Sequence, residues 1–159
     1  MGVGAGGGRV NDVEFAAQMT RLRKLADKWV KPIGLGWWRV EAEYERDSGN
    51  YHVDGEPSPN GVANIKADWR YMHATITFNM LRVAEQDDEH LEWIYVHELM
   101  HIFLNETRDL KGDGQLTTVR DDWLNHEERI ASTLAHAFIW IRNDAIEKTE
   151  TRLALAGGC

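Results

Sequence analysis

Cysteine is almost absent from this chain of 159 residues, which carries a single one at its last position, Cys159. One cysteine cannot form an intrachain disulfide, and it cannot build a thiolate zinc site alone. A fold stapled by intrachain disulfides is therefore excluded, and nothing in the cysteine content points to an oxidising compartment.

Long apolar runs are also missing. No stretch approaches the roughly 18 apolar residues that a membrane-spanning helix requires, so we expect no membrane partner. Residues 1–10 are rich in glycine and lack the apolar core of a signal peptide. We expect them to be a disordered lead-in, and we expect the protein to be cytoplasmic in the cell that produces or hosts it.

Positive charge is in deficit. The chain has 18 Lys and Arg against 26 Asp and Glu, which leaves a formal net charge of −8. A basic surface for nucleic acid is therefore not expected. The length suffices for one domain with a buried core, which we place over 11–147, followed by a flexible tail over 148–159.

The most informative segment is an H-E-x-x-H motif formed by His97, Glu98 and His101. On a helix, residues four apart lie one turn above each other on nearly the same side, so both imidazoles can reach one metal ion. Glu98 lies beside them, where it can take a proton from a metal-bound water. Zinc hydrolases use these residue types at this spacing.

The residues around the motif predict a buried helix. The segment is apolar on most sides, through Ile94, Leu99, Met100, Ile102 and Phe103. The alternative is a core helix whose two histidines are only hydrogen-bonded. A carboxylate and two imidazoles at metal-ligand spacing favour the metal site.

A helix and two strand regions are expected before the motif. Apolar residues at spacings of three and four predict an amphipathic helix over 12–31, capped by Asn11 or Asp12. Alternation over 37–46 predicts a strand with one wet face, and a second strand region is expected over 63–80, at a sheet edge near a cleft. A turn at 47–50 and a loop over 55–61 lie between them.

Two helices are expected around and after the motif. Asp87 or Asp88 can cap the motif helix, and a loop over 105–119, either a lid or a connector, follows it. Asp121-Asp122 can cap a last helix, which frays from about residue 147. Its apolar positions predict a buried stripe made of Ile130, Ala131, Leu134, Ala135, Phe138, Ile139 and Ile141.

The motif supplies two metal ligands, and a catalytic zinc site usually has three. No third histidine follows His101 at metzincin spacing. Glu127 and Glu128, near the start of the last helix, are the candidates, because a carboxylate there has little structural purpose without a partner. The alternative is that both are solvated residues of a first helical turn.

Taken together, these residues resemble those of a known family of metallopeptidases. H-E-x-x-H with a downstream helical Glu is the gluzincin arrangement, and Glu128-x-x-Ala131-Ser132-x-Leu134-Ala135 is similar to the E-x-x-A-N-x-F-A signature of ImmA/IrrE-type metallopeptidases. Residues 97–104 and 127–140 also resemble short phage-borne metallopeptidases. The chain departs from the ImmA/IrrE pattern in having Ile139-Trp140-Ile141 where that helix ends in Leu-Met-Pro.

The resemblance implies an α+β, zincin-like fold of the minimal gluzincin type. Its parts would be an N-terminal helix, a small and mainly antiparallel sheet, the H-E-x-x-H helix and a C-terminal helix carrying the third ligand. It also implies one Zn²⁺ per chain, held by His97, His101 and Glu128. Glu127 is the alternative third ligand, because it lies on the predicted apolar stripe.

The expected activity is zinc-dependent endopeptidase cleavage of one dedicated protein or peptide substrate. Glu98 takes a proton from the metal-bound water and later passes it to the leaving amine. His126, Tyr95 and His73 are candidates, in that order, for stabilising the oxyanion.

Two other functions fit the same residues. The first is a zinc-binding, zincin-like regulatory or interaction module with little or no proteolytic activity. The second is a metal-free helical domain that binds a partner, with which the seven Trp are compatible. The presence of Glu98 favours an enzyme over these two functions, because a purely structural metal site needs no general base.

Overall fold

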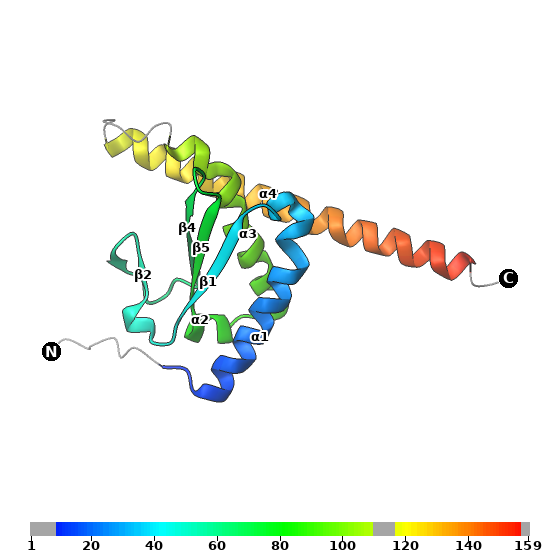
Figure 1. The fold of residues 1–159 in the computed structure, drawn as a ribbon, viewed down its shortest axis with the longest axis horizontal. Coiled ribbons are helices and arrows are strands. Elements are labelled where there is room, and N and C mark those ends of the chain that lie inside the picture. The colour runs from blue at the N-terminus through cyan, green and yellow to red at the C-terminus, as the bar shows by residue number, and fades with distance from the viewer. Residues whose placement is uncertain (1–8, 110–116, 157–159) are drawn as a thin grey trace.

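A central three-stranded sheet organises the fold. A computed structural model describes the backbone of residues 9–109 and 117–156, and the side chains of 9–105 and 125–155. The strands are β1 (Arg39–Glu45), β4 (Ala63–Asp68) and β5 (His73–Asn79), in the spatial order β1–β5–β4. Helices lie on one side of the sheet, and a small hairpin lies on the other (Figure 1). The fold is therefore α+β, as expected.

The sheet is mixed rather than mainly antiparallel. β4 pairs antiparallel with β5, but β1 pairs parallel with β5 from Arg39↔His73 to Glu45↔Asn79, and this is the longest ladder. The chain leaves β1 through the small hairpin and then runs back along β4. β5 therefore returns in the direction of β1, and this direction follows from topology rather than from the alternation within each strand.

The region 63–80 is two strands, not one. The backbone reverses at 69–72, where the Arg70 amide donates to Asp68 Oδ1 at 3.0 Å and Met72 adopts a φ of 48°. Alternation continues on both sides of this turn, so the pattern alone does not reveal the reversal. β5 is consequently the central strand, and β4 is the edge.

The first helix and first strand form as expected. α1 (Asp12–Trp29) begins at Asn11, whose side chain accepts from the Glu14 amide at 2.9 Å. A π-helical turn, Lys31–Leu35, ends it where Gly34 has a φ of 94°. In β1 the charged side chains of Arg39, Glu41 and Glu43 are exposed and Glu45 is half-buried, which gives the predicted wet face.

The small hairpin falls partly on the expected loop. A 3₁₀ turn, Ser48–Asn50, precedes β2 (His52–Val53), which pairs antiparallel with β3 (Glu56–Pro57). Asp54 and Gly55 join them with φ values of 53° and 87°. This Asp-Gly pair suits a two-residue hairpin turn, in which both central residues need positive φ.

An aromatic stack joins the sheet to the helices. The ring of Phe78 in β5 lies 6.3 Å from Tyr44 of β1 and 6.0 Å from Tyr95, and Phe15 of α1 meets Tyr44 edge-on. Trp29, at the end of α1, is buried and donates its Nε1–H to Glu92 at 2.8 Å. These contacts place the core between the sheet and the helices.

Replacing Phe78 with alanine is expected to lower the free energy of unfolding by about 3–5 kcal/mol, because the ring is fully buried at the centre of this stack. Chemical denaturation followed by circular dichroism measures it. Tyr71→Ala is the control, because Tyr71 is 79% exposed and its loss should change stability by no more than about 0.5 kcal/mol. Equal effects from both variants would contradict this core.

The motif helix is longer than expected. After the short α2 (Met80–Ala84), α3 runs over Asp88–Asp109 and is capped by Asp87, which accepts from the His90 amide at 2.7 Å. Residues 105–109 are helical rather than loop, and at Asn105 the side-chain amide bonds to the Ala67 carbonyl of β4. The expected lid within 105–119 would now fall on 110–116, which lies outside the described residues.

The last helix is also longer than expected. α4 spans Thr117–Ala156, so Asp121-Asp122 lie inside it rather than at its cap. Its 40 residues make a rod of about 60 Å that projects past the rest of the molecule (Figure 1). It does not stop near 147, because no glycine or proline interrupts it and Lys148 bonds to Asp144 at 2.7 Å, one turn away.

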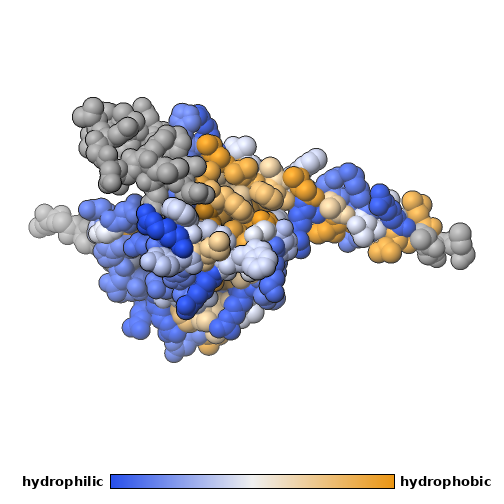
Figure 2. Space-filling view, turned by 45° about the horizontal axis from the view of Figure 1, so that its top comes forward, coloured by the Kyte–Doolittle hydropathy of each residue, from blue (hydrophilic) through white to orange (hydrophobic). Residues whose placement is uncertain are grey.

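The apolar stripe of α4 is only partly buried. Ala131 and Ala135 are fully buried, but Ile130 and Ile141 are 41% and 55% exposed. The helix approaches α3 closely through the small alanines, which leaves the larger side chains at the rim. Apolar side chains are accordingly visible at the surface along α4 (Figure 2). No helix in the described part of the chain is both long and apolar enough to cross a membrane.

Candidate metal centre

The H-E-x-x-H residues lie on the most buried helix of the fold. Val96, Leu99 and Met100 of α3 have no exposed surface, and His97, Glu98 and His101 are each less than 10% exposed. The predicted burial of the motif is thus confirmed. Because apolar neighbours occupy the other faces of α3, the two imidazoles turn toward α4 and the carboxylate lies beside them.

Three side chains converge on one point between α3 and α4. His97 Nε2 lies 3.1 Å from His101 Nε2 and 3.2 Å from Glu128 Oε2, and His101 Nε2 lies 3.4 Å from Glu128 Oε1. A tetrahedral ion with bonds of 2.0–2.1 Å separates its ligands by about 3.3 Å. His97, His101 and Glu128 therefore form a group that could hold a metal ion.

The opposite edge of each imidazole also has a partner on α4. Glu127 Oε1 lies 2.9 Å from His101 Nδ1, and the Ser132 hydroxyl lies 3.3 Å from His97 Nδ1. Consecutive helical residues point about 100° apart, so Glu127 and Glu128 reach different sides of His101. The converging group contains Glu128, whereas Glu127 contacts the far edge of the His101 imidazole.

A tryptophan packs against the first histidine. The ring of Trp93, one turn before the motif, lies 5.2 Å from His97, and it also contacts His90 at 5.6 Å and His136 at 5.7 Å. These contacts restrict the orientation of the His97 ring. Trp93 was not singled out from the sequence, although its position four residues before His97 places it on the same helical face.

The centre is electrostatically crowded. Burial raises the pKa of the Glu98 carboxyl, the nearby Glu128 raises it further, and His101 and His97 act against this. Burial disfavours the charged form of His101, but the bond to Glu127 and the charges of Glu98 and Glu128 outweigh it and raise the pKa of His101. The carboxylates around His101 therefore favour the positively charged form of its imidazole.

Two further residues belong to the surroundings of the centre. Asn105, one turn past His101, donates its amide to the Ala67 carbonyl at 2.6 Å and so ties α3 to β4. Tyr51 is buried, and burial together with the Glu98 charge raises the pKa of its phenol. The four-residue spacing from His101 could have indicated Asn105, but no sequence signal places Tyr51 near Glu98.

The three candidates for the oxyanion have different positions. Tyr95 is buried in the aromatic stack with Phe78, which argues against contact with a substrate. His73 bonds to Glu41 across β1 and β5 at 2.9 Å. His126 is exposed on α4 next to Glu127, and its role stays a prediction.

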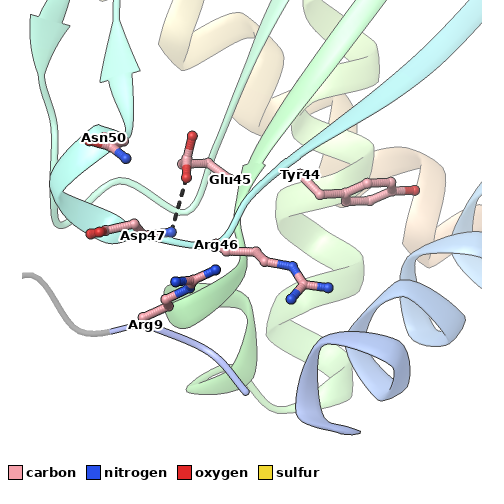
Figure 3. A pocket seen from close by; sticks show the side chains of 6 residues that line it. All are labelled: Arg9, Tyr44, Glu45, Arg46, Asp47 and Asn50. Carbon is pink, nitrogen blue, oxygen red and sulfur yellow. Dashed lines mark hydrogen bonds between the residues drawn. The ribbon is translucent and has the colours of Figure 1, made fainter. Parts of the chain in front are cut away.

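A separate hollow of about 400 Å³ lies where β1 ends (Figure 3). Arg9, Arg46, Glu45 and Asp47 line it together with Tyr44 and Asn50. Two basic and two acidic side chains line it, so their formal charges cancel. The converging histidines are not among its lining residues.

Comparison of the chain with protein-family models, with curated proteins and with solved structures gives no match.

Proposed function

We propose that this protein is a zinc-dependent metalloendopeptidase with a zincin-like fold of the minimal gluzincin type. The observation that carries the proposal is the convergence of His97, His101 and Glu128 at separations of 3.1–3.4 Å. Two nitrogen ligands and one carboxylate leave a fourth tetrahedral position open, which is the arrangement of catalytic rather than structural zinc sites. The order of α1, sheet, α3 and α4 supports the fold assignment.

Bound zinc would supply a water of lowered pKa and polarise the substrate carbonyl. Glu98 accepts the proton of the attacking water and delivers it to the nitrogen of the leaving amine. Its burial suits both steps, because a carboxyl whose pKa is raised holds a transferred proton more readily and a water-poor site keeps that proton on Glu98. His97 and His101 would hold the ion through Nε2, since Ser132 and Glu127 occupy their Nδ1 edges.

A proton acceptor beside the ion favours an enzyme over a zinc-binding module. Structural zinc sites are closed by four protein ligands and need no base. Glu98 is 8% exposed and lies on the same helix as two ligands, where it would be a costly residue to bury without a chemical role. The proposed substrate is a protein or peptide.

The proposal is tested first by metal content. Protein purified from zinc-replete cells is expected to contain about one zinc per chain, and Glu128→Ala is expected to lower the affinity at least 100-fold, because it leaves two ligands on one helix. Elemental analysis and competition with a chromophoric chelator measure these values. Glu150→Ala, an exposed position of α4, should bind zinc like the wild type.

Hydrolysis is tested on a broad peptide library analysed by mass spectrometry. Cleavage that requires zinc supports the peptidase. Stoichiometric zinc with no cleavage of any peptide or protein would favour the regulatory module instead. Absence of metal from the wild type after zinc-replete expression would overturn both.

A further inference from the structure

We propose that Glu127 is a positioning residue that fixes the tautomer and orientation of His101. That the ion held by His101 is zinc rests on the function proposed above. Glu127 Oε1 lies 2.9 Å from His101 Nδ1, and both side chains are buried. Glu127 is only 4% exposed, whereas the adjacent Glu128 keeps 60% of its side chain accessible. Two consecutive carboxylates of α4 therefore have different environments and different tasks.

The burial of Glu127 sets the position of the shared proton. A carboxylate inside a protein is retained only where donors compensate for lost hydration. His101 Nδ1–H is such a donor, and α4 directs Glu127 Oε1 at it. With the proton on Nδ1, the lone pair of Nε2 points at the site between His97 and Glu128, as a metal ligand requires.

The two histidines are held unequally. Behind His97 lies the neutral Ser132 hydroxyl at 3.3 Å, whereas behind His101 lies a buried carboxylate at 2.9 Å. A hydrogen bond to a charged acceptor is shorter and stronger than one between neutral groups. His101 is also flanked on its other edge by Glu128, so one segment of α4 contacts both edges of the same imidazole. Glu127 therefore contributes more to the metal site than Ser132 does.

The first experiment compares zinc affinities by chelator competition. Glu127→Gln keeps the size of the side chain but removes its charge, and it is expected to weaken zinc binding about 10–100-fold. Ser132→Ala should weaken it less, and Glu150→Gln should leave it unchanged. Wild-type affinity in Glu127→Gln would overturn the proposal. Complete loss of zinc, equal to that of Glu128→Ala, would also overturn it, because Glu127 would then be a ligand.

The second experiment needs no metal. Imidazole ¹⁵N chemical shifts of the metal-free protein, measured above the pH at which His101 titrates, report which nitrogen carries the proton. Wild-type His101 is expected to be the Nδ1–H tautomer, and Glu127→Gln should shift it toward Nε2–H, whereas a merely structural role would leave the tautomer unchanged. An Nε2–H tautomer in the wild type would overturn the assignment. If the wild type bound no zinc, the proposed function would fail, but this measurement would still decide the role of Glu127.

Discussion

Replacing Glu98 with glutamine is expected to lower kcat for peptide hydrolysis by about 10²–10⁴-fold while zinc stays bound. Glutamine has nearly the same shape but cannot accept the proton of the attacking water. His97, His101 and Glu128 are unchanged in this variant, so the ligand group is preserved. Steady-state kinetics on a cleaved peptide, together with the zinc content of the same sample, measure the two effects separately.

The matched control is Glu89→Gln, an exposed position in the first turn of the same helix, which should keep full activity. Glu98→Gln should also be no less stable than the wild type, because burial disfavours the ionised carboxyl that the substitution removes. Undiminished hydrolysis in Glu98→Gln would remove this residue from the mechanism.

Removing zinc with a strong chelator is expected to lower the melting temperature by about 8–16 °C. An ion present at 1,000 times its dissociation constant stabilises the native state by about 4 kcal/mol, and each kcal/mol shifts the melting temperature of a domain of this size by about 2–4 °C. The carboxylates of Glu98 and Glu127 are buried, and without the ion they would lose its compensating charge. Differential scanning calorimetry with and without chelator gives the shift.

Adding zinc back should restore the original melting temperature, and a His97→Ala/His101→Ala variant should not respond to chelator or to zinc. A wild type whose melting temperature ignores the chelator would instead support a metal-free partner-binding domain. This experiment is independent of substrate, so it separates the loss of the metal from a failure to find the peptide that is cleaved.

Much of the candidate site could be predicted because it is local in sequence. His97, Glu98 and His101 are on one turn of one helix, so their proximity follows from helix geometry alone. The prediction that Glu128 joins them required only that a second helix pack against the first. The choice between Glu127 and Glu128 could not be made in advance, because it depends on the rotation of α4 about its axis. The alanines Ala131 and Ala135 set that rotation.

Less of the fold could be predicted, because strand pairing depends on contacts between residues far apart in sequence. Alternation identifies a strand but not its partner, so the hairpin at 69–72 and the parallel pairing of β1 with β5 were missed. The contact of Asn105 with Ala67 joins positions far apart in sequence, at the point where α3 continues beyond its expected end. Local propensity carries no information about such contacts.

The great length of α4 has a consequence for local unfolding of the protein. Near its middle α4 packs against α3 through the buried Ala131 and Ala135, whereas in the segment after Arg142, which lies over the Trp29 ring, most side chains are exposed. An isolated helix of that size is marginal in water. The free energy of local unfolding is therefore expected to fall along α4, and to be lower after Arg142 than where Glu127 and Glu128 lie.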